Sequence, residues 1–155
     1  MHTPNNKKLH KTTIANCTLD TAWWKWTSHE GLKTFFGADN SIRLRLGGPF
    51  EIYFMLDAPL GQRGGEGNKV ISYLPKKMLS FTWNAPPHIQ EVRNHEHKTW
   101  VVVELEEVDN TQTKVSLSHI GWLDGAAWEE TFDYFDSAWE RVLEWFSNSC
   151  EKNAE

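Results

Sequence analysis

The stretch from Trp128 to Phe146 constrains the fold of this chain more than any other segment. Apolar side chains recur in it every three or four residues and carboxylates occupy the opposite side, a pattern that predicts one long amphipathic helix. Its apolar stripe consists of Trp128, Phe132, Phe135, Trp139, Val142, Leu143 and Phe146. Such a stripe must lie on an apolar surface. Because short strands dominate the preceding sequence, we expect a sheet to provide that surface and a pocket between the two to be the functional site.

The sequence upstream predicts seven short strands and two short helices. The helices follow the first strand, since Asp20 can cap one of them and Thr27–Glu30 has the form of a capping box for the next, which Gly37 would end. The predicted strands span residues 11–17, 41–46, 50–54, 69–74, 78–83, 99–107 and 113–119. Consecutive strands followed by one long helix predict an α+β fold, in which an antiparallel sheet packs its concave face on that helix.

Composition narrows the class of protein. The length of 155 residues and the hydrophobic content of 39% suit a single domain over residues 1–155, with 1–8 and 150–155 as flexible tails. A net charge of −5 without a basic cluster argues against a nucleic-acid partner. The sequence contains no signal peptide and no apolar run of transmembrane length, so we expect a cytoplasmic protein without a membrane span. Cys17 and Cys150 lack a CxxC spacing; reduced thiols are the default expectation and a bridge between them is the alternative.

Several segments together resemble a known family. They are the Trp-rich helix with its break at Thr27–Ser28, Leu46–Phe50, the run from Gly67 to Trp83, Thr113–His119 before Gly121, and Trp139 in the last helix. In order and spacing they are similar to the homologues of the activator of the heat-shock protein 90 ATPase, a family of the START-like, birch-pollen-allergen-like (SRPBCC) superfamily. The resemblance covers most of the chain. It implies a helix-grip fold, in which a seven-stranded antiparallel sheet wraps around a long C-terminal helix and encloses a hydrophobic cavity, with two short helices after the first strand.

The superfamily also contains lipid carriers, hormone receptors and polyketide cyclases, so the fold does not select one function. Three hypotheses follow. The first is a protein that binds a small apolar or aromatic ligand between sheet and helix, without a cofactor. The second is a protein-interaction module that resembles a chaperone ATPase activator. The third is a cyclase-like or hydrolase-like enzyme that uses His119, Tyr53 or Tyr73, although the sequence contains no catalytic motif.

Residues expected to face the cavity are the candidate ligand contacts, and packing in the core is the alternative for each of them. His119 alternates with Val115 and Leu117 on an apolar face. It is either a core histidine whose ring is satisfied by a backbone group or the polar anchor of a ligand. The candidate cavity residues are Phe36, Phe50, Phe54, Phe81, Trp83, His119, Phe132, Phe135 and Trp139.

Two polar loops carry residue types that are typical of functional sites. His88, His95 and His97 share one loop, but a loop of this kind lacks the rigidity of a zinc site, and we expect no metal there. The glycine-rich segment 57–67 lacks the lysine and the helix N-terminus of a phosphate loop. We expect it to be flexible and to act as a lid over the pocket.

Three aromatic residues lie outside the main apolar stripe. Tyr134 and Trp145 belong to a second stripe of the last helix, and Trp100 points away from the apolar face of its strand. Exposed aromatic side chains are enriched at association surfaces. These three residues are therefore candidates for a homodimer contact.

Overall fold

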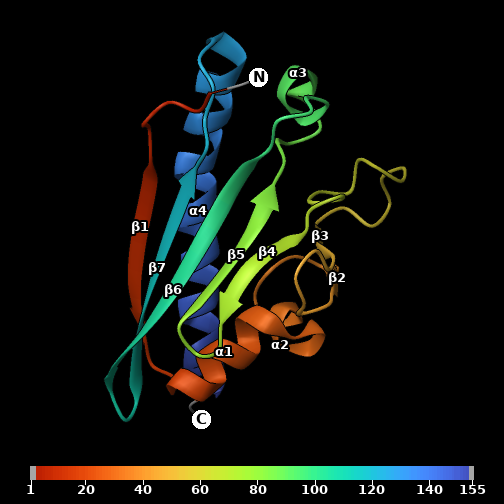
Figure 1. Cartoon of the computed structure of the whole chain (residues 1–155). Helices are drawn as coiled ribbons and strands as arrows, with labels where there is room; N and C mark the ends of the chain where they lie inside the picture. The colour runs from red at the N-terminus through yellow and green to blue at the C-terminus, as the bar shows by residue number, and fades with distance from the viewer. Residues whose placement is uncertain (1–2, 154–155) are drawn as a thin grey trace.

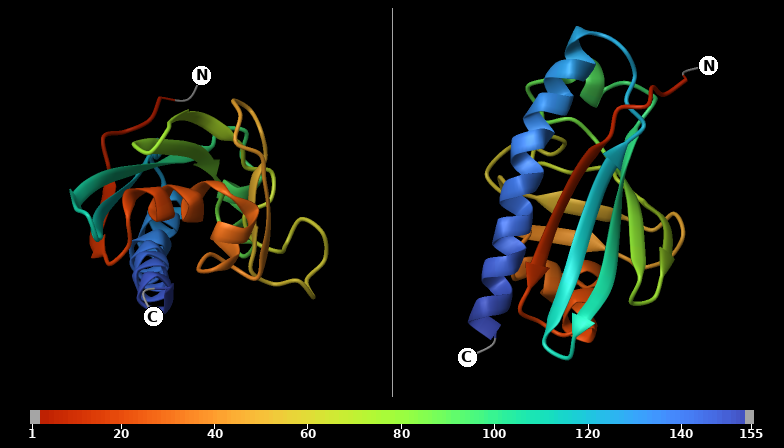
Figure 2. Two further views of the ribbon diagram at one scale, coloured as in Figure 1. Left: turned by 90° about the horizontal axis from the view of Figure 1, so that it is seen from below. Right: turned by 90° about the vertical axis from the view of Figure 1, so that its left-hand side faces the viewer.

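The computed structural model describes residues 3–153 and has the helix-grip architecture of an α+β protein (Figure 1). A five-stranded antiparallel sheet has the order β1 (Leu9–Ala15), β7 (Gln112–Ile120), β6 (Thr99–Asp109), β5 (Met78–Trp83) and β4 (Val70–Leu74). The long helix α4 (Ala126–Asn153) lies along one face of this sheet and beside β1 (Figure 2). The other elements are α1 (Leu19–Thr27), α2 (His29–Lys33), β2 (Asp39–Ile42), β3 (Phe50–Tyr53) and α3 (Gln90–Arg93).

The seven strands do not form the one continuous sheet that was predicted. β2 and β3 pair with each other in a separate two-stranded sheet. This hairpin meets the main sheet at one corner, where the Gly47 N–H donates to the Val70 carbonyl at 2.8 Å and the Phe50 N–H donates to the Asn68 carbonyl at 2.9 Å. A register shift between Val70 and Ser72 disrupts the β4 ladder at the same corner. The contact between the two sheets is therefore a short bridge instead of a full ladder.

The two short helices after β1 are separated by one extended residue. Thr18 caps α1 in place of Asp20, and its Oγ1 accepts a backbone N–H of the first turn at 3.1 Å. Ser28 ends α1 and caps α2, because its Oγ accepts the Gly31 N–H at 2.9 Å. The helices touch at Gly31, where an added Cβ would lie 2.2 Å from the Trp24 carbonyl oxygen. A glycine is thus required for this tight helix pair.

Helix α4 is longer than the sequence pattern predicted. It begins at Ala126 and continues past Phe146 to Asn153, and Cys150 is buried within it. At the other end of the chain, the Asn5 N–H donates to the Trp122 carbonyl at 2.7 Å. Flexible tails at 1–8 and 150–155 remain a prediction, and residues 1, 2, 154 and 155 lie outside the described part of the chain.

The core fills the space between α4 and the sheets. α4 buries Phe135, Trp139, Leu143 and Phe146 against them. Phe146 also contacts Trp26 of α1, with the ring centroids 5.7 Å apart. Each such buried side chain stabilises the fold by roughly 1.5–3 kcal/mol. Among residues 3–153, no helix is both long enough and apolar enough to cross a membrane.

Candidate functional site

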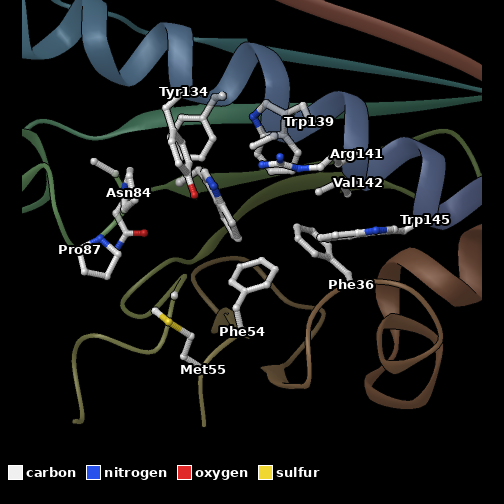
Figure 3. A pocket seen from close by; sticks show the side chains of 16 residues that line it. Phe36, Phe54, Met55, Asn84, Pro87, Tyr134, Trp139, Arg141, Val142 and Trp145 are labelled. Carbon is white, nitrogen blue, oxygen red and sulfur yellow. The ribbon is translucent and has the colours of Figure 1, made fainter. Parts of the chain in front are cut away.

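A pocket of about 290 Å³ opens between the middle of α4 and the end of β5. In Figure 3, Tyr134, Trp139 and Trp145 extend from α4 on one side, and Phe54 and Met55 approach from the other. The wall is mainly apolar, and its aromatic members are Phe36, Phe54, Trp83, Tyr134, Phe135, Trp139 and Trp145.

The pocket lies where the sheet stops supporting the helix. Trp83 is the last residue of β5, and Pro86 and Pro87 follow shortly after it. Proline has no N–H to donate to a strand ladder, so the chain leaves the sheet here. The turn that results lines one side of the opening, opposite the mid-helix residue Trp139.

Five candidate residues from the sequence lie together in this wall. Phe36 follows α2, Phe54 follows β3, Trp83 ends β5, and Phe135 and Trp139 come from α4. Their rings contact one another: the centroids of Phe36 and Trp83 are 5.7 Å apart, and those of Trp83 and Trp139 are 5.4 Å apart. Their role as ligand contacts remains a prediction.

Three of the other candidates, Phe50, Phe81 and Phe132, lie outside the lining. Phe50 and Phe81 are fully buried and stack on each other, with ring centroids 3.9 Å apart and an interplanar angle of 16°. Phe132 lies one helical turn before the pocket and packs on Trp122 at 5.2 Å, with the Lys7 ammonium 4.4 Å above its ring. These three rings therefore contribute to packing in the structure.

The last candidate, His119, is fully buried and has a partner at each ring nitrogen. The Trp139 indole N–H donates to His119 Nδ1 at 2.9 Å. Because Nδ1 accepts this bond, the ring proton of the neutral imidazole must be on Nε2, which donates to Thr99 Oγ1 at 2.7 Å. The Thr99 hydroxyl in turn donates to the Trp83 carbonyl at 2.9 Å.

This chain of hydrogen bonds joins the side chain of Trp139 to the backbone of Trp83, and both residues belong to the pocket wall. Burial lowers the pKa of His119 to about 3, so the imidazole is neutral at physiological pH and accepts the bond from Trp139. In the structure His119 is buried in the core. Its ring nitrogens are bonded to the side chains of Thr99 and Trp139, whereas the core alternative had expected a backbone partner. His119 contacts the pocket wall through Trp139 and through the ring of Phe135, whose centroid lies 5.1 Å away.

The second stripe of α4 forms part of the pocket wall, which the sequence did not predict. Tyr134, Ala138, Arg141 and Trp145 all line the pocket. The sequence feature that could have indicated this is their helical spacing, because it places them beside Phe135 and Trp139 at the edge of the buried face. Tyr134 and Trp145 are 39% and 43% exposed, so the rim presents apolar rings to solvent.

Trp100, the third candidate for a homodimer contact, is on the other face of the sheet. It alternates with the buried Val101 and covers Gly121, where an added Cβ would lie 2.3 Å from the Trp100 ring. The three candidate residues therefore do not form one patch. A homodimer through Tyr134, Trp145 and Trp100 remains a prediction that would need two separate surfaces.

The glycine-rich loop is anchored, in contrast to the flexible lid that we expected. The Glu66 carboxylate accepts the backbone N–H groups of Arg63 at 2.5 Å and Gly64 at 3.2 Å. The Arg93 guanidinium lies 3.6 Å from the same carboxylate and donates to the Ala85 carbonyl at 2.6 Å. Burial lowers the pKa of Arg93. Since Gly64 and Ala85 both line the pocket, this ion pair joins two sides of its rim.

The three loop histidines are arranged as aromatic neighbours. His88 packs on Tyr134 with ring centroids 5.6 Å apart, and His95 and His97 pack on Trp128 at 5.3 and 5.9 Å. In residues 3–153 no three His, Cys, Asp or Glu side chains are grouped as a metal site would require.

Neither tyrosine of the enzyme hypothesis lines the pocket. The Tyr53 hydroxyl donates to Glu51 at 2.5 Å, and burial together with this carboxylate raises the pKa of Tyr53 to about 12. Tyr73 lies in β4, at the edge of the main sheet. The geometry thus places no nucleophile and base pair in the lining of this pocket.

A long helix held by an antiparallel sheet, with an apolar pocket between them, defines a helix-grip protein. Residues 16–149 match the family described as "Activator of Hsp90 ATPase homolog 1-like protein", and the chain belongs to this family. No curated protein sequence gave a significant match.

Solved structures share this fold at low sequence identity. The Aha1 dimer of Colwellia psychrerythraea has a TM-score of 0.69 and 19% identity, over 94% of this chain and 96% of that one. PFC0360w, an Hsp90 activator of Plasmodium falciparum, has a TM-score of 0.65 and 16% identity, over 88% and 91%. DynU16, a putative protein of the dynemicin biosynthetic locus, has a TM-score of 0.68 and 15% identity, over 96% of this chain and 49% of that one.

Proposed function

We propose that the protein binds a small, flat aromatic or apolar molecule in the pocket between α4 and the end of β5. The observation that carries this proposal is the aromatic wall, to which α4, β5 and the segments after α2 and β3 all contribute. Ligand sites are mostly apolar hollows of roughly 300–1,000 Å³ with few polar groups. The volume of about 290 Å³ is at the small end of this range and suits a molecule of two or three fused rings.

The exposed rings at the rim support the same function. Phe54, Tyr134 and Trp145 are 38–43% exposed at the mouth of the pocket. A bound ring would remove part of this apolar surface from water, which stabilises a complex by roughly 25 cal/mol per Å² before the losses of motion on binding are subtracted. Asn84 and Arg141 are polar members of the lining that can orient a ligand.

Binding suits this lining better than catalysis does. A general base must be within hydrogen-bond reach of the group it deprotonates. His119 is buried behind Trp139, and both of its ring nitrogens are already bonded. A cyclase-like activity of this site would therefore depend on the pocket holding the substrate in a reactive conformation, without a general base from His119.

The experiment is a binding titration with naphthalene, indole and flavone as probes, followed by native mass spectrometry and by the NMR signals of the tryptophan indole N–H groups. We expect saturable binding with a dissociation constant of about 1–100 μM for at least one probe. Ala138→Trp fills the pocket and should weaken binding at least about tenfold. Ser137→Trp adds the same side chain at an exposed neighbouring position outside the lining and is the matched control.

A second function, regulation of a chaperone ATPase, is supported by membership of the activator-homologue family. The same two variants separate the alternatives. Stimulation of the turnover of an Hsp90-type ATPase that Ala138→Trp leaves unchanged, together with no binding of any probe, would favour the second function over the first.

A further inference from the structure

Two thiols and a lysine meet in the interior at the end of the molecule opposite α3. Cys150 is fully buried near the C-terminal end of α4, and Cys17 is buried in the segment between β1 and α1. Lys25 of α1 is fully buried beside them. Figure 1 shows α1 next to the C-terminal end of α4. This cluster is separate from the pocket, whose lining contains none of the three.

Independent contacts hold the two cysteines side by side. Both thiols belong to the same buried cluster and lie close enough for each to shift the pKa of the other. Their sequence neighbours are joined as well, because the Asn16 amide donates to the Glu151 carboxylate. The backbone of Cys17 is fixed by Thr113, whose Oγ1 donates to the Cys17 carbonyl at 3.0 Å. The pair is thus positioned by β7 and α4 together.

Lys25 lacks the partner that a buried ammonium normally has. Its Nζ donates to Thr34 Oγ1 at 2.9 Å, and within residues 3–153 no carboxylate lies at ion-pair distance from it. An unpaired buried charge is costly, and burial accordingly lowers the pKa of Lys25, while the two thiols oppose that change. A thiolate is the counter-ion that this lysine can obtain in its surroundings.

The protonation of the pair fits this arrangement. The hydrogen bond from Cys17 lowers the pKa of Cys150, and the charge of Lys25 acts in the same direction. Interaction with Cys150 and burial raise the pKa of Cys17. Of the two sulfurs, Cys150 is the one whose pKa is lowered, and Cys17 is the neighbouring thiol that can react next.

We propose that Cys17 and Cys150 form a reversible intramolecular disulfide, and that Lys25 stabilises the thiolate that reacts first. The oxidant is a peroxide. The Cys150 thiolate attacks one peroxide oxygen, the O–O bond breaks and hydroxide leaves, which a proton converts to water. The Cys17 sulfur then attacks the resulting sulfenic acid, the S–S bond forms and a second water leaves with the Cys17 proton. Two thiols are oxidised and one peroxide is reduced.

Oxidation at this place has a structural consequence. The bond would join the start of the chain to the end of α4 and so close a long loop, which is the arrangement in which a cross-link restricts the unfolded chain most. Access is provided by the end of α4, since helix ends open more readily than helix centres.

The experiment is oxidation of the reduced, purified protein by a small excess of hydrogen peroxide. We expect the intact mass to fall by two hydrogen atoms, one peptide to link Cys17 with Cys150, and the melting temperature to rise by about 10 °C. Dithiothreitol should reverse all three changes. Cys17→Ser and Cys150→Ser should each abolish the linked peptide and the shift in melting temperature.

The role of Lys25 is tested by Lys25→Met, with the exposed Lys33→Met as the control. We expect the oxidation rate at neutral pH to fall about tenfold and its pH profile to move to higher pH. Cys17, Glu151 and the hydroxyl of Ser149 also act on Cys150 and stay in place in this variant. An unchanged rate and pH profile in folded Lys25→Met would remove the lysine from the proposal.

Oxidation of the wild-type protein tests whether the disulfide forms, even if one of the variants fails to fold. Unreacted thiols, sulfinic acids, or bonds between two chains in place of the linked peptide would overturn the proposal.

Discussion

Trp139 and His119 are joined by a hydrogen bond of 2.9 Å from the indole N–H to the imidazole Nδ1, and this bond connects the pocket wall to the core. The indole face lines the pocket, while its N–H group points to the histidine and is not available to a ligand. Trp83 is held from the other end of the same chain, through Thr99. One buried histidine therefore orients the ring of Trp139 and is linked to the backbone of Trp83.

Replacing His119 should destabilise the protein and disturb the wall. His119→Ala removes a buried ring and leaves the Trp139 N–H without an acceptor, so we expect the free energy of unfolding to fall by about 3–5 kcal/mol. Urea denaturation measures it. Trp139→Phe removes the donor together with part of the buried ring and should cost about 1–3 kcal/mol. In the double variant the two losses should be clearly less than additive, and strict additivity would mean that the bond is not formed in solution.

The protein should lose stability as the pH falls, in a range set by His119. Its pKa is about 3 in the folded state and about 6.5 when unfolded, so only the unfolded state takes up a proton between these values. The contribution is fully present above about pH 6.5, decreases as the pH falls, and reaches a loss of about 5 kcal/mol near pH 3. The contribution of His119 is the difference between the pH dependence of the unfolding free energy of the wild type and that of His119→Gln, whose amide does not titrate. Both are measured by denaturation at several pH values. Parallel pH profiles of the two proteins would contradict it.

Gly31 and Gly47 should respond very differently to alanine. At Gly31 the new Cβ would meet backbone of α1 at 2.2 Å, whereas at Gly47 nothing lies within 4 Å. We expect Gly31→Ala to cost about 3 kcal/mol or more, because backbone atoms must move. Gly47→Ala carries only the strain of its positive φ of 77°, about 1 kcal/mol. The comparison is made by thermal denaturation, and equal losses would mean that α2 does not pack this closely on α1.

Glu66→Gln should loosen the glycine-rich loop without unfolding the protein. The neutral amide cannot hold Arg93 by charge, and it accepts backbone N–H groups less strongly than the carboxylate does. We expect amide hydrogen exchange of residues 61–67 to accelerate about tenfold or more, and probe affinity to fall a few-fold. The exposed Glu107→Gln is the control. Unchanged exchange in Glu66→Gln would show that the loop is held by other contacts.

The sequence allowed the fold class to be predicted because helical and strand periodicities are local properties. The stripe through Trp139 identified α4, and the alternation through Val115 and Leu117 identified β7. The separation of β2 and β3 from the main sheet could not be predicted, since it depends on hydrogen bonds around Val70 that link distant segments. Such pairing is decided by tertiary contacts and not by local pattern.

The candidate site was predictable only in part, for a similar reason. Aromatic content indicated that Trp83 and Phe135 would be buried, but a ring in a wall and a ring in the core have the same sequence signature. Phe81 precedes Trp83 by two residues on the same face of β5, and yet it stacks on Phe50 while Trp83 borders the pocket. The difference arises from where β5 ends. The partners of His119 are equally non-local, because Thr99 and Trp139 each lie about 20 residues away.

The narrow junction between the two sheets separates the part of the pocket mouth that follows β3 from the packing of α4 on the main sheet. Phe54 directly follows β3 of the small sheet, whereas the opposite wall is formed by α4 and the end of β5 in the main sheet. Substitutions around the hairpin can therefore change the width and shape of the mouth while the pairing of α4 with the five-stranded sheet is kept. Such a construction allows the shape of the pocket to vary while the fold is kept, and the fold is shared by solved structures at identities below 20%.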